Sequence, residues 1–561
     1  MKTISRREFL KDSAAFGIAA AGLNLPAFSL KNQFDLVIKN GSVIDGTGRR
    51  EFKADLGIKN GRITAIGKLS HASADKVIDA RGLKVSPGFI DIHSHTDIQL
   101  LVNPRAESKI RQGITTEAGG QCGGSMAPLG GMNVDLDKSL QRIKDNLNID
   151  VTWRTFPEFM DYFSSQKFSI NLVMMAGLGS IRSFAMGEGN RRATEDEMNV
   201  MLSKIQEACH AGIVGVSSGL EYLPGSFSDS EELIRLCKAV PKAQRIYATH
   251  MRNEDKTVIE ALDEAIRIAQ ASDARLQVSH LKACGKSNWS KTDELLLMLE
   301  KAADSGLDIN ADRYTYTAYA TSLDMFFPLW AREGGDKFFL GRLSDKNQLG
   351  RMKESVEMKV SELNGAWNGI LIAGTPKPEY RHYQGKTVQN IADEMNMSAF
   401  DAAVRVILET ENLTDMVGFA MDEPNTEKIL SHPLVMIGSD SSVHSPEPPL
   451  GNKIAHPRGY GTFPRAIAHY VRERKICPLE TMIKKMTSMS AKKLGLNDRG
   501  AIEKGKIADI TIFDFNKIQD NAEYSNPHQY PEGIPYVIIN GIPVIEQGIH
   551  TQSYPGQLLR G

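Results

Sequence analysis

Residues 86–95 read SPGFIDIHSH, a short apolar run that ends in His93 and His95. Residues two apart on a β-strand face the same side, so both imidazoles can point at one centre. The run is bounded by a Pro-Gly pair at 87–88, a strong signal of a break before the strand. We therefore predict a buried strand over 86–93 that carries metal-binding side chains at its carboxyl end.

Seven more apolar runs follow this strand, separated by segments with helical spacing such as 196–212 and 256–272. Alternating strands and helices with nearly continuous apolar strands favour a parallel sheet, and eight such units favour a closed (β/α)₈ barrel. The expected fold class is thus α/β, with a TIM-like barrel over 86–487. Its expected strands are 86–93, 113–118, 170–177, 212–218, 246–250, 276–280, 307–312 and 434–440.

The two ends of the chain share a sequence pattern that differs from that of the barrel. Short strands and Asn-Gly pairs, a hairpin signal, occur at 40–41 and 60–61 and again at 540–541. Each end alone has too little core, so we predict one small β-sandwich domain built from 31–85 and 488–561. A connection of about 120 residues before the last barrel strand is too long for a plain loop and predicts a helical insertion at about 320–425, over the barrel mouth.

Composition excludes several classes of partner. The chain has 561 residues, 41% of them hydrophobic and 24% charged, with a net charge of −1. Charges of both signs are interspersed, whereas nucleic acid and anionic membranes select basic patches, so neither is an expected partner. The five cysteines have no spacing that indicates a disulfide framework.

The first thirty residues resemble a twin-arginine export signal. Arg6 and Arg7 precede a short apolar run, AAFGIAAAGLNLPAF, at 14–28. The resemblance implies a signal peptide over 1–30, export by the twin-arginine machinery and a periplasmic or otherwise exported location. The alternative is a basic N-terminus before an amphipathic helix. No later stretch reaches 18 apolar residues, so no transmembrane helix and no stable membrane insertion are expected.

Side chains of the metal-binding type follow five of the expected strands. Each alone has a plainer interpretation: a hydrogen-bonded histidine, a small buried cysteine, or a helix N-cap at Asp440, which precedes two serines. Their coincidence on one predicted face, where barrels keep their active sites, favours a metal centre instead. The residues are His93, His95, Cys122, His250, His280 and Asp440.

The donor types point to zinc. Thiolate and imidazole form a borderline-soft set, and three protein ligands leave a fourth position open for catalysis. Zinc generates hydroxide from water at neutral pH, and Asp440 could accept the proton and pass it to a leaving amine. From these residues alone the reaction is either hydrolysis or deamination.

The chain resembles the amidohydrolase superfamily and, within it, the N-acyl-D-amino-acid deacylases, or D-aminoacylases. The resemblance is carried by PGFIDIHSH, ITTEAGGQCGGSMAP, IYATHMRNE, VSHLKACGKSNW, VMIGSDSS and HPRGYGTFPR. It implies that Cys122, His250 and His280 hold one tight zinc, and that His93 and His95 line a weaker second metal position. It further implies that Asp440 is the general acid and base, and that Cys122 replaces a bridging carboxylated lysine.

The same resemblance places five side chains in the substrate-binding set: Lys282, Tyr316, Ser322, Tyr222 and Arg458. A cation beside the site can pair with an α-carboxylate, and Tyr316 could donate to a developing oxyanion; a structural clamp at Arg458 and a packed tyrosine at Tyr316 are the alternatives. The chain departs from the family pattern at Leu178, Gln121 and Glu221, which leaves the pocket open to interpretation. An acidic Glu221 could favour an amine-bearing substrate, or be a solvated loop residue.

Three functions are compared. The first is hydrolysis of a linear N-acyl-D-amino acid, or of a dipeptide with a C-terminal D-residue, to release the free amino acid. The second is a cyclic-amide hydrolase of the hydantoinase or dihydroorotase type, against which Cys122 argues. The third is a non-catalytic exported binding protein, which predicts loss of a ligand or of Asp440, whereas all are present.

Overall fold

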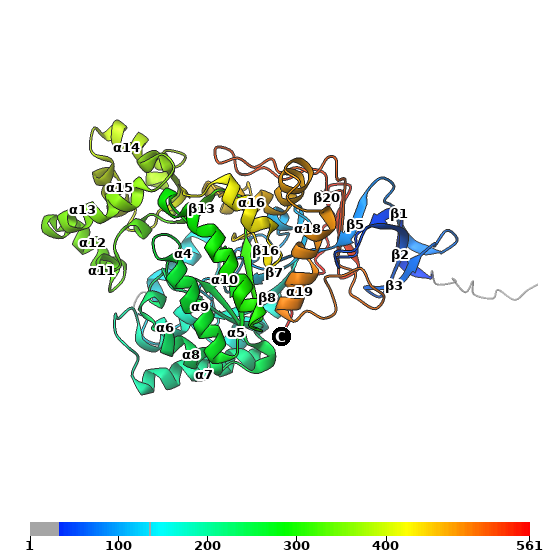
Figure 1. Ribbon diagram of the computed structural model, residues 1–561, viewed down its shortest axis with the longest axis horizontal. Helices are drawn as coiled ribbons and strands as arrows, with labels where there is room; N and C mark the ends of the chain where they lie inside the picture. The colour runs from blue at the N-terminus through cyan, green and yellow to red at the C-terminus, as the bar shows by residue number, and fades with distance from the viewer. Residues whose placement is uncertain (1–32, 134–135) are drawn as a thin grey trace, which may run out of the picture.

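Three parts follow one another along the long axis of the molecule: a β-sheet from the two chain ends, a central barrel and an inserted subdomain (Figure 1). The computed structural model describes residues 33–133 and 136–561. The predicted signal peptide over 1–30 lies outside the described residues. Within these ranges no helix is long and apolar enough to cross a membrane.

The centre is an eight-stranded parallel sheet with strand order β16-β12-β11-β10-β9-β8-β7-β6. Every expected barrel strand overlaps an observed one, and the predicted fold class is confirmed. The expected strand 86–93 is divided, because Lys84–Pro87 (β5) pairs in the end sheet and the barrel begins at Phe89. The barrel strands are β6 (Phe89–Asp91), β7 (Ile114–Gly119), β8 (Asn171–Gly177), β9 (Gly215–Gly219), β10 (Ile246–His250), β11 (Arg275–Val278), β12 (Ile309–Arg313) and β16 (Val435–Ile437).

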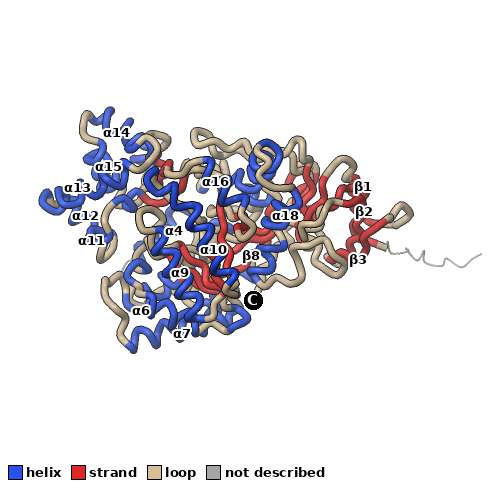
Figure 2. The backbone as a smooth tube through the Cα atoms, viewed as in Figure 1, coloured by secondary structure: helices blue, strands red, loops and turns tan. Residues whose placement is uncertain are grey.

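Helices pack around this sheet (Figure 2). Their apolar faces and the outward side chains of the strands form the largest hydrophobic core of the molecule. These helices are α2 (Gln99–Val102), α3 (Glu107–Ile110), α5 (Phe156–Ser165), α6 (Leu178–Met186), α7 (Glu195–Ala211), α8 (Ser230–Lys238), α9 (Val258–Ser272), α10 (Thr292–Asp304), α16 (Glu423–Ser431), α17 (Arg458–Arg465) and α18 (Leu479–Met486). Helix α4 (Leu136–Leu147) has no buried residue and lies outside this core.

The first and last strands meet through their extensions. The amide of Asp440 donates to the carbonyl of His93 at 2.8 Å, and the amide of His95 donates to that of Ser441 at 3.2 Å. Beneath this seam the fully buried Lys109 ammonium contacts Asp91 at 2.9 Å and Glu117 at 3.3 Å. A buried ion cluster of this kind is strongly destabilising to break, so it fixes the strand ends that carry the site.

Helix α19 (Ser488–Leu494) closes the opposite end of the barrel. Its Ala491 and Leu494 belong to one buried cluster with Ile90 and Ile246 from the barrel strands. This segment was predicted to belong to the composite β-domain over 488–561, but it packs on the barrel instead. A short helix is stable where its apolar side chains are buried, and here the barrel strands bury them.

The two chain ends form one nine-stranded sheet. Strand β5 joins them, because it pairs in parallel with β1 and antiparallel with β17, with Val85 opposite Ile512. The strands are β1 (Phe34–Val43), β2 (Phe52–Lys59), β3 (Arg62–Gly67), β4 (Ala74–Asp79), β5, β17 (Ile510–Phe513), β18 (Tyr536–Ile539), β19 (Ile542–Glu546) and β20 (Ile549–His550).

The three Asn-Gly pairs do not all make hairpins. Those at 60–61 and 540–541 turn between paired strands, as expected. Asn40 lies instead in a bulge inside β1, where the register shifts between Ile38 and Gly41. Its φ is +63°, a conformation that Asn tolerates, and its side chain donates to Asp79 at 2.8 Å, which explains why the hairpin signal misled.

The insertion was predicted to be helical, and the structure adds a three-stranded antiparallel sheet with order β13-β15-β14. These strands are only five residues long, too short to distinguish from loops by periodicity. The insertion has its own hydrophobic core. Its elements are β13 (Ala318–Ser322), α11 (Leu329–Arg332), α12 (Asp336–Ser344), α13 (Lys346–Ser361), β14 (Ile370–Gly374), α14 (Val388–Met395), α15 (Ala399–Glu409) and β15 (Asp415–Phe419).

Candidate metal centre and active site

All six expected metal-type side chains meet at the mouth of the barrel. His250 ends β10, and the other five follow the carboxyl ends of β6, β7, β11 and β16. They form two groups, and within each group the ligand atoms lie within 4.8 Å of one another. One group is Cys122, His250 and His280; the other is His93, His95, Cys122 and Asp440. Cys122 belongs to both groups and so lies between them.

The backbone is held in an uncommon conformation at three of these residues. The φ angle is +50° at Cys122, +35° at His280 and +50° at Asp440. Left-handed conformations of non-glycine residues cost of order 1–3 kcal/mol and persist only where the surroundings enforce them. Gly123 allows the loop at Cys122 to approach β9 closely. A side chain at position 123 would place its Cβ 2.6 Å from the amide nitrogen of Gly219.

The distances fit a divalent metal of borderline softness. The Sγ of Cys122 lies 3.4 Å from Nε2 of His93 and 3.4 Å from Nε2 of His280. Behind the rings, His280 Nδ1 lies 2.8 Å from Glu254 Oε1 and His93 Nδ1 lies 3.2 Å from Asp312 Oδ1. Carboxylates in this position fix the tautomer and orientation of metal-binding histidines. The donor set and its support therefore suit a metal such as zinc.

Electrostatics prepare Cys122 to be a thiolate. Burial alone would raise its pKa, but the imidazoles of His93 and His280 hold the pKa well below the ordinary thiol value. Burial opposes charging of His250 as well, yet Glu254 and the Cys122 thiolate raise the pKa of His250 to about 10. The cluster without metal thus pairs thiolate with imidazolium, and a metal ion would replace those protons.

Asp440 stands at the edge of the cluster as a carboxylate. Its Oδ1 lies 3.0 Å from Nε2 of His95, and its Oδ2 accepts a hydrogen bond from Arg458 at 2.7 Å. Burial opposes ionisation, but the Arg458 guanidinium and His280 hold the pKa of Asp440 well below its usual range. The side chain is therefore ionised and able to accept a proton.

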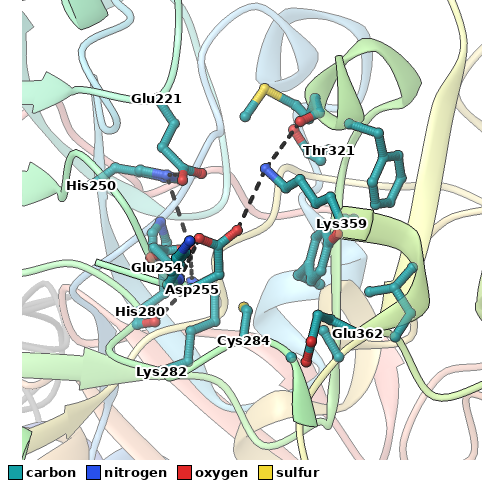
Figure 3. A pocket seen from close by; sticks show the side chains of 18 of the residues that line it. Glu221, His250, Glu254, Asp255, His280, Lys282, Cys284, Thr321, Lys359 and Glu362 are labelled. Atoms are coloured by element: carbon teal, nitrogen blue, oxygen red, sulfur yellow. Dashed lines mark hydrogen bonds and ion pairs between the residues drawn. The ribbon is translucent and has the colours of Figure 1, made fainter. Parts of the chain in front are cut away.

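Sequence reasoning missed the carboxylate that supports the cluster from behind. Glu254 Oε2 lies 2.6 Å from the Lys282 ammonium, and Figure 3 shows it beside His280 and Lys282. Burial opposes its ionisation, but Lys282 keeps the pKa of Glu254 below the usual range. The only available signal was its place four residues after His250, in THMRNE. Glu221 also approaches Nε2 of His250, at 3.3 Å.

A cavity of about 900 Å³ opens from the cluster between the barrel and α13. Of the expected substrate-binding residues, Lys282, Tyr222 and Arg458 line it. Tyr316 and Ser322 do not, which corrects that part of the prediction. Tyr316 is buried and donates to Asp520 at 3.2 Å, whereas the Ser322 hydroxyl donates to Asp324.

Residues near Tyr316 and Ser322 in the sequence line the cavity instead. Tyr319 and Thr321 line it, and Tyr222 Oη lies 3.3 Å from Thr321 Oγ1. Lys359 of the insertion also lines it and pairs with Asp255 of the barrel at 3.6 Å, seen in Figure 3. The insertion thus supplies one wall of the site.

A parallel barrel with a composite end sheet and a cluster of metal-type side chains at its mouth is the architecture of an amidohydrolase. A model described as the amidohydrolase family matches residues 390–545, and one for the N-terminal domain of the urease alpha-subunit matches 20–87. D-aminoacylase of Alcaligenes xylosoxydans is 33% identical over 526 residues, 94% of this chain and 97% of its own length.

Solved structures agree with these matches. N-acyl-D-glutamate deacylase of Bordetella bronchiseptica, complexed with zinc and a phosphonate inhibitor, has a TM-score of 0.80 at 30% identity, covering 94% of this chain and all of its own. L-hydantoinase of Arthrobacter aurescens has a TM-score of 0.54 at 16% identity, covering 94% of this chain and all of its own, and shares the fold alone. The chain belongs to the D-aminoacylase family of amidohydrolases.

Proposed function

We propose that this protein is a zinc-dependent hydrolase of the linear amide bond of N-acyl-D-amino acids, releasing a carboxylate and the free D-amino acid. One observation carries the proposal: a single thiolate, Cys122, is shared by a histidine pair and by a second group that contains the carboxylate of Asp440. A metal position and a proton acceptor therefore adjoin each other in one cavity.

Cys122, His250 and His280 would hold the tight zinc, and His93 and His95 would line a weaker second position. The relatives support a metal here, since one solved structure contains zinc and another copper. When bound, the ion supplies a Lewis acid that polarises the scissile carbonyl and lowers the pKa of water.

Asp440 would move the proton. As a carboxylate it accepts a proton from the attacking water and later donates it to the leaving amine. Its Oδ2 is anchored by Arg458 at 2.7 Å, which leaves Oδ1 toward His95 and the cluster. The carboxylate is thereby fixed beside the place where the amide would lie.

Cations of the cavity would bind the α-carboxylate of the amino acid. Lys282 is almost fully buried, and its ammonium is held by Glu254 at 2.6 Å. Arg458 is also buried, and its Nε has no hydrogen-bond partner among the described residues. An orphaned buried guanidinium N–H is costly, and a substrate carboxylate would satisfy it.

The proposal includes export. Arg6, Arg7 and the apolar run at 14–28 support a twin-arginine signal. Replacing both arginines by lysine should shift the protein from the periplasmic to the cytoplasmic fraction in a host with this pathway. Unchanged distribution of the variant would contradict the assignment.

The function is tested by amino-acid release from matched N-acetyl-D- and N-acetyl-L-amino acids with acidic, apolar and basic side chains. The zinc-loaded protein should hydrolyse the D series only. Hydrolysis of the L series, or of cyclic amides in place of both, would overturn the proposal.

A further inference from the structure

A second cavity adjoins the metal cluster at His95 and Asp440, and Lys282 does not line it. It has a volume of about 700 Å³ and shares only Ala320, Thr321, His95, Asp440 and Arg458 with the first cavity among the described residues. We name the larger cavity the first chamber and this one the second chamber. Since the proton acceptor lines both, a bound amide would extend from one chamber into the other.

The walls of the second chamber are largely apolar. They come from α4, from the insertion sheet and from the loop that follows β16 (α4, β13 and β16 are labelled in Figure 1). The apolar lining side chains include Ile143, Leu147, Met416, Leu450 and Ile454. A chain of methylene groups would gain roughly 0.8 kcal/mol for each CH₂ buried against such walls.

Two arginines give this apolar chamber a positive charge. Its carboxylates are already paired, Asp415 with Lys453 at 2.6 Å and Asp440 with Arg458 at 2.7 Å. Arg142 and Arg381 also line the chamber, and neither has a carboxylate partner within 33–133 and 136–561.

Hydrogen bonding leaves the same two side chains available. Arg142 donates to Ser139 Oγ at 3.2 Å. The Nε of Arg381 is buried and without a hydrogen-bond partner in the described part of the chain. Burial lowers the pKa of His444 to about 3, so this lining histidine adds no charge at neutral pH. An anion is the group that this chamber is built to receive.

The first chamber contains the buried lysine proposed to bind the α-carboxylate. This residue, Lys282, lines the first chamber and not the second. The amino-acid part therefore belongs in the first chamber, and the acyl part extends into the second.

We propose that the second chamber binds the acyl group and selects acyl chains that end in a carboxylate, the monoamides of dicarboxylic acids. This inference rests on the proposed function and names its preferred substrate class. The methylene chain contacts the apolar walls, and the terminal carboxylate receives hydrogen bonds from Arg142 and Arg381.

The test compares N-acetyl-, N-hexanoyl- and N-adipoyl-D-leucine, which separate chain length from terminal charge. Hydrogen bonds to charged groups predict kcat/KM for the adipoyl substrate at least about tenfold above the hexanoyl one. R142M and R381M should each lower adipoyl turnover by about tenfold and leave acetyl turnover within about twofold. K144M, on the same helix as Arg142 but outside the chamber, should change neither.

Equal or faster turnover of the hexanoyl substrate would overturn the inference. So would variants that impair N-acetyl-D-glutamate rather than the adipoyl compound, because the chamber would then bind a side-chain carboxylate. If no derivative is hydrolysed, the proposed function fails instead. Calorimetric binding of adipoyl-D-leucine to the parent protein and to R381M then decides the inference alone: equal affinities overturn it, and about tenfold weaker binding by R381M supports it.

Discussion

The two ends of the barrel both contain buried charges, and they are organised differently. At the base, the Lys493 ammonium lies 2.7 Å from Asp308, whose other oxygen accepts from Arg275 at 2.8 Å, so each charge has a partner. At the mouth, three residues have strained backbones and Arg458 keeps an unpartnered Nε. Paired charges stabilise a fold. A strained backbone and an unpartnered polar group cost stability and are retained where they serve function. Substitutions should therefore separate activity at one end from stability at the other.

The largest effect is expected for C122A. Cys122 is shared by both groups of metal-type side chains, so its loss should remove bound zinc and lower turnover by at least about 10³-fold. Metal content by plasma mass spectrometry and amino-acid release measure the two effects. C209A is the matched control, since Cys209 is a buried cysteine in α7 that belongs to neither group. Full zinc in C122A would disprove the shared-ligand assignment.

E254Q should have a smaller effect on zinc binding at the mouth of the barrel. Replacing the carboxylate behind His280 should weaken zinc binding by about 10- to 100-fold, as loss of such supporting groups does in other metal sites. Competition with a chelator measures the affinity, and activity should return at saturating zinc. E260Q, an exposed change in α9, is the control. Unchanged affinity in E254Q would show that Glu254 merely fills space.

K493M at the base should act on stability alone. It removes a buried ammonium and leaves Asp308 half exposed and still paired with Arg275. Burial lowers the pKa of the Lys493 ammonium to about 8, which offsets part of the pairing, so we expect a loss of about 1 kcal/mol in the free energy of unfolding. Denaturant titration measures it, and kcat/KM of the folded variant should be unchanged. A fall in kcat/KM with normal stability would contradict the division between the two ends.

The smallest effect concerns pH. Burial opposes ionisation of Asp308, but Lys493 lowers the pKa of Asp308 to about 2. A depressed carboxyl pKa stabilises the fold above the unfolded value of about 3.9, and this contribution disappears as pH falls toward 2. The stability difference between the protein and D308N should thus be about 1 kcal/mol at pH 6, because the group is partly exposed, and should shrink below pH 4. A difference independent of pH would contradict the pairing.

The barrel was predictable because its signals are local and repeated. Eight apolar runs bounded by helical segments fix the strands, and the carboxyl ends of parallel strands must meet at one face. The composite end sheet was predictable because neither chain end can bury its strands alone. That the six metal-type residues lie together was predictable because each stands at or just after the end of a strand.

The remaining features depend on packing between distant segments. Glu254 supports His280 through a loop whose path no periodic pattern records, and Tyr316 packs on Asp520 from far along the chain. The insertion sheet joins strands from three separated segments. Asn40 satisfied a hairpin pattern, but a bulge uses the same left-handed backbone. In each case the local signal was weak or shared by two structures.

The most direct test of the account is zinc content and turnover of D440N, measured on the same preparation. Asp440 lies beside the cluster and is proposed to move protons rather than to hold the tight metal. The account predicts one tightly bound zinc, as in the parent protein, with turnover lowered by at least about 10³-fold. Loss of the zinc, or turnover near that of the parent, would contradict it.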